Sequence, residues 1–173
     1  WGKSAGTVTH MRWTSSISEA TSLAEAANEV ASDLAAALGD TTPDLVFAFV
    51  STDHGADYDR LPQLLNAGLG GLLVGCSGAG VIGAGREAEH RHALAACAVE
   101  MPGVEVTPFH VEADRLPDAD ASPDQWERLV GVGSDAEPCF VVLADPFTLP
   151  TESLLMGLDY AFPRSIKIGG MAS

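Results

Sequence analysis

The first part of the chain shows a helical spacing of apolar residues. Between Ala20 and Leu38, Ala, Leu and Val recur every three or four positions, and polar residues fill the opposite face. Ser16 and Glu19 have the S-x-x-E spacing of a capping box, and Gly39 follows the last apolar position. The pattern predicts a helix that begins near Ser16, ends before Gly39 and packs against a sheet through an alanine-rich stripe.

Two stretches of the chain repeat the order strand, helix, strand. Leu45–Ser51 and Leu72–Cys76 are apolar runs of strand length, and a short helix is expected between them at 60–68. A similar arrangement recurs 94 positions later in the sequence. The corresponding positions are Asp44–Ser51 with Pro138–Asp145, Leu61 with Leu155, and Gly75 with Gly169. The chain is therefore predicted to contain two similar β-α-β units.

An antiparallel hairpin is expected around the Pro102-Gly103 pair. His92–Met101 and Val104–Glu112 lie on either side of this pair, which is typical of a tight turn. Together with the alternation of strands and helices, this predicts an α/β fold with a mixed sheet built from two similar β-α-β units plus an antiparallel hairpin. Because the two units have matching lengths, we expect them to share one sheet.

The length of 173 residues fits a single domain. Met11 is a plausible native start, so we interpret residues 1–10 as a tag, linker or disordered terminus and 11–173 as the domain. The last residues follow a second apolar strand and Gly-Gly pair, an unusual place for a domain to finish. We therefore expect the domain to be incomplete.

Charge and cysteine content narrow the function classes. The net charge of −15 repels phosphate backbones, which argues against nucleic-acid binding. Leu61–Gly85 carries no charge, but eight glycines and several polar residues interrupt it, so we expect no membrane span. Three widely spaced cysteines without zinc spacing, and no visible secretory signal, predict free thiols and a cytoplasmic location. No motif calls for a cofactor.

The most distinctive segment is Gly70–Gly85, which reads GGLLVGCSGAGVIGAG. Its glycines do not have the order of a dinucleotide fingerprint, it lacks a P-loop Gly-Lys-Ser/Thr, and the residues after it are poor helix formers. It is interpreted either as a glycine corner needed for packing or as a pocket of main-chain amides for a small ligand. The candidate ligand-binding residues are Gly75, Cys76, Ser77, Gly78, Ala79, Gly80 and His54.

Two other constellations are alternatives. If the two predicted strands lie side by side, Cys76, His54 and Asp53 meet at one rim of the sheet, as an activated thiolate requires. The competing interpretation is an inert, buried cysteine. His90 and His92 are two positions apart and would share one face of a strand, so that they could chelate a metal, with His110 on the same side. The competing interpretation there is a solvated strand edge.

The segments LLVGCSGAGVI, DLVFAFVS and the preceding SSISEA helix resemble the N-terminal part of the FIST domain, as does the closing IGGMAS. The resemblance extends from about Arg12 to Ser173, and GCSGAGVI at Gly75–Ile82 is its specific part. It implies a sensory module of signalling proteins, also found with F-box segments, that binds small ligands such as amino acids. It also implies a C-terminal FIST half, which we expect to be missing from this chain, and it brings no catalytic residues.

These observations lead to one leading hypothesis and two rivals. The leading hypothesis is a sensory domain that recognises amino acids or small carboxylates through the glycine-rich segment, with Gly169-Gly170 as a further contact. Its expected partners are a small ligand and a C-terminal FIST half or a signalling domain. The rivals are an interaction scaffold or adaptor without a ligand, and an enzyme that uses Cys76 as nucleophile and His54 as base.

Overall fold

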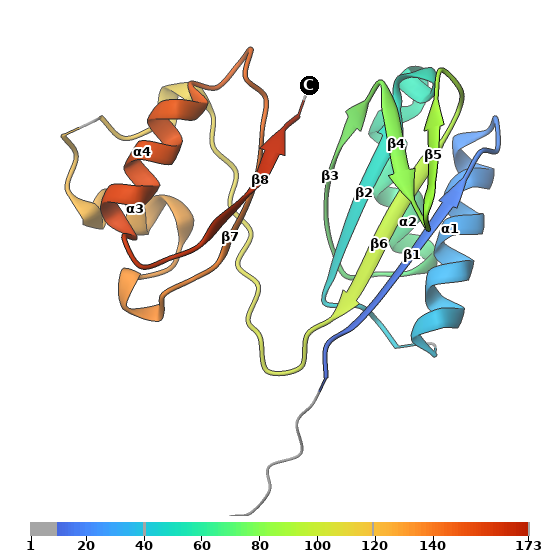
Figure 1. Cartoon of the computed structure of the whole chain (residues 1–173), viewed down its shortest axis with the longest axis horizontal. Helices are drawn as coiled ribbons and strands as arrows, with labels where there is room; N and C mark the ends of the chain where they lie inside the picture. Colours follow the sequence, from blue (N-terminus) through green and yellow to red (C-terminus); the bar gives the residue numbers. More distant parts are fainter. Residues whose placement is uncertain (1–9, 40, 119, 173) are drawn as a thin grey trace, which may run out of the picture. The chain divides into compact units, whose positions relative to one another are not determined.

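The computed structural model describes residues 10–39, 41–118 and 120–172, which form two compact units with their boundary between Glu105 and Val106. We call them unit 1 and unit 2 (Figure 1). Apart from His10, the expected tag or linker lies outside the described residues. The expected extent of the domain, residues 11–173, stays a prediction.

Unit 1 is built on a four-stranded mixed sheet with the order β1-β6-β2-β3. Its strands are β1 (Arg12–Ser18), β6 (Leu94–Glu100), β2 (Leu45–Ser51) and β3 (Leu72–Gly78). The central pair β6 and β2 is antiparallel, whereas β2 and β3 are parallel and connected through a helix. The predicted α/β class with a mixed sheet is therefore confirmed.

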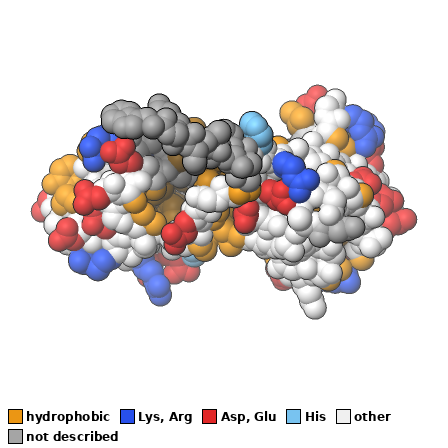
Figure 2. Space-filling view, turned by 90° about the horizontal axis from the view of Figure 1, so that it is seen from below, with side chains coloured by type: hydrophobic (Ala, Val, Ile, Leu, Met, Phe, Trp, Pro, Cys, Tyr) orange, Lys and Arg blue, Asp and Glu red, His pale blue; other side chains and the backbone are white. Residues whose placement is uncertain are grey.

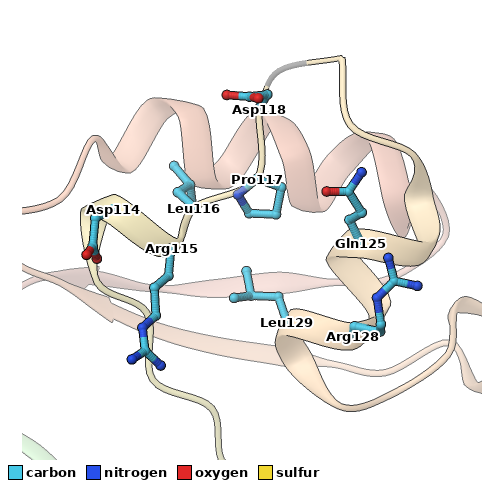
Figure 3. Close-up of a pocket in the computed structure, with 8 residues that line it drawn as sticks. All are labelled: Asp114, Arg115, Leu116, Pro117, Asp118, Gln125, Arg128 and Leu129. Atoms are coloured by element: carbon cyan, nitrogen blue, oxygen red, sulfur yellow. The ribbon is translucent and has the colours of Figure 1, made fainter.

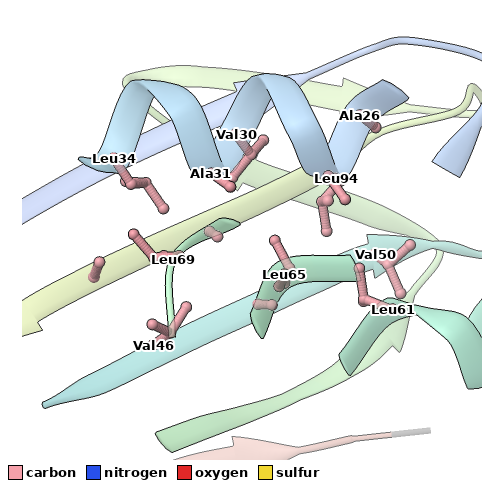
Figure 4. Packing of buried hydrophobic residues seen from close by; sticks show 14 of the residues in the cluster. Ala26, Val30, Ala31, Leu34, Val46, Val50, Leu61, Leu65, Leu69 and Leu94 are labelled. Carbon is pink, nitrogen blue, oxygen red and sulfur yellow. The ribbon is translucent and has the colours of Figure 1, made fainter. Parts of the chain in front are cut away.

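Two helices cover one face of this sheet (Figure 4). α1 (Leu23–Leu38) contributes the predicted stripe, and α2 (Leu61–Gly68) follows the 3-10 helix η1 (Thr52–Arg60). The predicted start of α1 is wrong, because Ser16 belongs to β1 and donates a 2.7 Å hydrogen bond to Asp33 of the helix. The capping-box spacing occurs here in a strand, where Ser16 links β1 to α1.

The antiparallel hairpin of unit 1 lies on the other face of the sheet. It consists of β4 (Gly80–Gly83) and β5 (Arg86–Glu89), joined by a turn in which Ala84 and Gly85 have φ of 47° and 73°. The location predicted for the hairpin, residues 92–112, is wrong. β6 pairs with β1 on one edge and with β2 on the other, so that it has no edge left for residues 104–112.

Unit 2 contains two parallel strands with two helices packed on one face. β7 (Phe140–Ala144) pairs with β8 (Lys167–Met171), and α3 (Pro123–Val130) and α4 (Thr151–Ala161) enclose the apolar core. The short 3-10 helices are η2 (Ala113–Arg115) and η3 (Ser134–Ala136). The expected single sheet is wrong: β7 and β8 form a sheet of their own, and the second edge of β2 is already occupied by β6.

The predicted repeat is confirmed by the way the strands pair in each unit. Ala48 lies opposite Gly75 in unit 1, and the residues 94 positions later, Val142 and Gly169, lie opposite each other in unit 2. A Cβ atom at Gly75 would be 1.8 Å from the Ala48 carbonyl oxygen, and one at Gly169 would be 1.8 Å from that of Val142. Glycine is required at both positions because the neighbouring backbone occupies the space of a side chain.

We expect Gly169→Ala to lower the free energy of unfolding of unit 2 by about 1–3 kcal/mol, the usual cost of forcing atoms into filled space. The matched control is Gly170→Ala, since a Cβ there meets nothing within 4 Å. Urea denaturation followed by the fluorescence of Trp126, which is buried in the same unit, measures both variants. Equal stability of the two variants would contradict the packing role of Gly169.

Candidate functional site

The candidate site lies where β2 and β3 end. The two strands are parallel neighbours, and their last residues, Ser51 and Gly78, are paired. η1 with His54 follows Ser51, and Ala79 and Gly80 follow Gly78. Segments that leave adjacent parallel strands emerge at the same edge of a sheet, which is where open α/β sheets place ligands.

The glycine-rich segment is mostly extended backbone and not a single turn. β3 continues through Gly78 and β4 begins at Gly80, so that Ala79 alone separates the two strands. As the sequence predicts, no helix begins after the glycines. Gly75 is explained by its close approach to β2, and the residues left for ligand contact are those at the end of the strand, from Ser77 to Gly80.

Ser51 holds this edge together. It is fully buried; its N–H donates to the carbonyl of Ala93 and its Oγ accepts from the N–H of Ala93, both at 2.9 Å. The carbonyl of Ser51 also accepts a 3.1 Å hydrogen bond from the Tyr58 hydroxyl in η1. One serine therefore joins the end of β2 to η1 and to the segment that precedes β6.

These hydrogen bonds bring two histidines together. His54 and His92 lie in edge-to-face contact, with ring centroids 4.8 Å apart. The His54 side chain is buried, with only 3% of its residue surface exposed, and its Nε2 has no hydrogen-bond partner in the described part of the chain. Most buried polar atoms in proteins have such a partner, so this nitrogen is exceptional.

The surroundings favour the neutral form of His54. Burial is the main cause that lowers the pKa of His54 below its ordinary value of 6.5, and the nearby His92 lowers it further. The carboxylates of Asp53 and Asp57 act in the opposite direction but do not outweigh these effects. At neutral pH the imidazole therefore has one nitrogen that donates and one that accepts.

The structure does not support the alternative hypothesis that Cys76 is a thiolate activated by His54. Cys76 lies opposite Phe49 within the paired strands, two positions before the end of β3, and Asp53 is exposed. Burial raises the pKa of the Cys76 thiol, and the described hydrogen bonds include none between Cys76 and His54. A protonated thiol without an adjacent base is a weak nucleophile.

The structure also does not bring His90, His92 and His110 together as metal ligands. His90 lies exposed in a turn with φ of 54°, after the end of β5, so it does not share a strand face with His92. His110 is exposed and belongs to unit 2. Among residues 10–39, 41–118 and 120–172, no three His, Cys, Asp or Glu side chains are placed to hold a metal ion.

A hollow of about 490 Å³ in unit 2 lies between the residues around η2 and helix α3 (Figure 3). Arg115 and Arg128 line it, and they are the described basic residues without an ion pair. Their guanidinium groups point to different sides of the hollow, and both side chains are exposed. The hollow therefore lacks the converging charges that would bind an anion.

The surface charge agrees with the composition. Figure 2 shows Asp and Glu side chains scattered over the face that it draws, with few Lys and Arg side chains among them. Most of the described basic side chains are paired with carboxylates, for example Arg86 and Arg91 with Glu19. This distribution does not favour binding of a polyanion.

Sequence reasoning missed Ser51 and the contact of His92 with His54. A signal for Ser51 was present, because it is the only hydroxyl residue in the apolar run Leu45–Ser51 and stands at its carboxyl end. No signal linked His54 to His92, since their contact depends on the antiparallel pairing of β2 with β6. The two paired strands are far apart in the sequence, and the hairpin of β4 and β5 lies between them.

The pKa of His54 is lower in the folded protein than in the unfolded chain. As the pH falls, the imidazole is therefore protonated at a higher pH in the unfolded chain than in the folded protein. We expect unit 1 to lose stability as the pH falls below about 6.5, by at most about 1.4 kcal/mol per pH unit. His54→Gln should weaken this dependence, and the exposed His110→Gln should not. Urea denaturation between pH 5 and 8, followed by the NMR signals of α1, measures it; identical profiles for His54→Gln and the parent would contradict it.

Comparison with known protein families identifies the family of the chain. The sequence matches the FIST N domain over residues 44–173, more than half of the chain, and this stretch contains β2, η1, β3 and β4. No curated protein matches the chain. In the part of the chain that the structure describes, no helix combines the length and apolar character needed to cross a membrane. The chain belongs to the FIST family, whose domains are sensory modules of signal transduction.

Proposed function

We propose that unit 1 senses a small ligand at the carboxyl edge of β2 and β3. The observation that carries the proposal is the buried Nε2 of His54, which has no partner and belongs to the segment that emerges beside Gly78. Ligand contacts come from His54 and from residues Ser77–Gly80. Of the other candidates, Gly75 and Cys76 support the strand that carries these residues.

The chemistry of the edge suits an amino acid. A neutral imidazole can accept a hydrogen bond from an ammonium group or donate one to a carboxylate. The main-chain N–H groups near Gly78 and Gly80 are suited to a carboxylate, because no side chain at these two positions blocks the approach. With a net charge of −15, the protein repels a dicarboxylate more than a zwitterion, so amino acids are preferred over small dicarboxylates.

The same edge offers a way to pass on the binding event. Ser51 connects β2 to η1 and to the segment that precedes β6. A ligand that engages His54 therefore acts on segments that are already hydrogen-bonded to one residue. We propose that the ordering of η1 is the change that a C-terminal FIST half or a signalling domain detects, in the cytoplasm, where free thiols persist.

The test is a thermal-shift screen of the protein against the amino acids and small carboxylates. A ligand at a hundredfold excess over its Kd stabilises the folded state by about 2.7 kcal/mol, which raises the melting temperature measurably. Gly78→Val should abolish this shift, because the added side chain obstructs the backbone; a Cβ at this position already lies 3.0 Å from the Gly80 carbonyl oxygen. His54→Gln should weaken it.

Leu34→Ala is the control for a general loss of stability. Leu34 is fully buried in the core under α1, so its truncation should cost about 2–5 kcal/mol without changing the ligand-induced shift. A shift that survives in both Gly78→Val and His54→Gln would place the ligand elsewhere. If no compound shifts the well-folded parent protein, the scaffold alternative gains support.

A further inference from the structure

The contact between His54 and His92 has the geometry of two ligands that share one metal ion. Two imidazoles on a tetrahedral Zn²⁺, with Zn–N distances of about 2.0–2.1 Å, have their ring centroids about 5 Å apart. The centroids of His54 and His92 are 4.8 Å apart. The planes of the two rings are inclined at 73°, so a nitrogen lone pair from each ring can meet at one point. Rings stacked in parallel could not do this.

The buried nitrogen of His54 is consistent with a metal ligand. Its Nε2 has no hydrogen-bond partner in the part of the chain that the structure describes, and so it does not bond to His92 although the two rings are in contact. The nitrogen of a neutral imidazole is the commonest protein ligand for metal ions. A ligand of this kind would satisfy a polar atom that the protein itself leaves unpaired.

Both histidines are held in place by the end of β2. His54 lies in η1, where the Tyr58 hydroxyl donates a hydrogen bond to the Ser51 carbonyl. His92 directly precedes Ala93, whose N–H and C=O are both bonded to Ser51. The pair is therefore positioned before a ligand binds, as a metal site requires. His92 is half-buried, so the pair can be reached from solvent on its side.

The local charge favours a cation at this pair. Burial lowers the pKa of His54, while the nearby carboxylates of Asp53 and Asp57 act in the direction that stabilises a positive charge there. The net charge of −15 adds a long-range attraction for cations. Imidazole nitrogens suit Zn²⁺, Ni²⁺ and Cu²⁺, whereas Mg²⁺ and Ca²⁺ prefer oxygen ligands. The ion that fits two histidines is therefore a transition metal.

We propose that His54 and His92 together bind a divalent transition-metal ion such as Zn²⁺, whose other coordination positions take the amino nitrogen and a carboxylate oxygen of an amino acid. In the described part of the chain no group of three His, Cys, Asp or Glu side chains is placed to hold a metal, so the ion needs ligands from a small molecule. The two polar groups of an α-amino acid can chelate one ion and fill the two positions that the histidines leave open. The part that concerns the amino acid rests on the proposed function.

The test is a titration of the ¹⁵N-labelled full chain with Zn²⁺ at neutral pH, followed by the ring NMR signals of the histidines. The signals of His54 and His92 should change together up to one equivalent of Zn²⁺, and the Nε2 signal of His54 should show that the ion binds there. The exposed His90 and His110 are internal controls that should respond only to excess Zn²⁺. Unchanged signals of His54 and His92, or a response of only one of them, would overturn the proposal.

Two variants measure the contribution of each ligand. His54→Gln and His92→Gln should each weaken Zn²⁺ binding at least about tenfold, because loss of a direct ligand costs no less than loss of a residue that supports one. The affinity is read from the ring signals of the remaining histidine, so that zinc bound by cysteine thiols does not contribute. His90→Gln is the matched control and should keep the parent affinity; equal affinities of His90→Gln and His92→Gln would contradict the paired site. The titration of the parent chain is independent of whether either variant folds.

The role of the amino acid is tested by repeating the thermal-shift screen of the amino acids with Zn²⁺ and with EDTA. We expect a shift that requires Zn²⁺ and disappears with EDTA. The same shift in the presence of EDTA would leave the proposed function intact and overturn the part of the metal in it. A response of the two histidines to Zn²⁺ without any amino-acid shift would support the metal site and contradict the proposed function.

Discussion

The parallel pairing of β2 with β3 is the interaction on which the rest of unit 1 depends. At its centre the backbone of β3 approaches β2 so closely that position 75 has no room for a Cβ atom. The pairing leaves β3 at the edge of the sheet and brings Ser51 beside Gly78. The glycine contact thus fixes the register, and the register decides which residues meet at the carboxyl end of the sheet.

The candidate site follows from that register and from one further contact. Ser51 bonds the main chain of Ala93, and its carbonyl accepts a hydrogen bond from the Tyr58 hydroxyl of η1; these contacts accompany the packing of His92 against His54. A buried histidine that stays neutral keeps one lone pair available, which suits the ammonium group of the amino acid that we propose as ligand. A change in the register of β2 and β3 would separate Ser51 from Gly78, and with them the two histidines from the glycine-rich segment. The candidate site therefore depends on the pairing of these strands.

Sequence patterns correctly predicted the elements whose structure depends mainly on their own residues. The stripe of α1, the strands β2 and β3 and the repeat at Gly75 and Gly169 follow from periodicity and from glycine placement. The patterns failed where distant segments compete. Ser16 has a capping spacing but lies in a strand, and residues 104–112 could not pair with β6 because β1 and β2 already do. The contact between His54 and His92 depends on the same long-range pairing, which is why no local pattern revealed it.

The glycine contact that recurs in both units also has an evolutionary consequence. Two tandem copies that share so specific a backbone contact are most simply explained by duplication of one ancestral half. The copies have since diverged at the sheet edge: Asp145 stands at the position of Ser51, and Thr148 at that of His54. Asp145 there accepts hydrogen bonds from the Phe147 N–H and the Thr148 hydroxyl and so closes a local turn. After such a duplication, the buried histidine of the first copy has no counterpart in the second, where a carboxylate holds the corresponding turn.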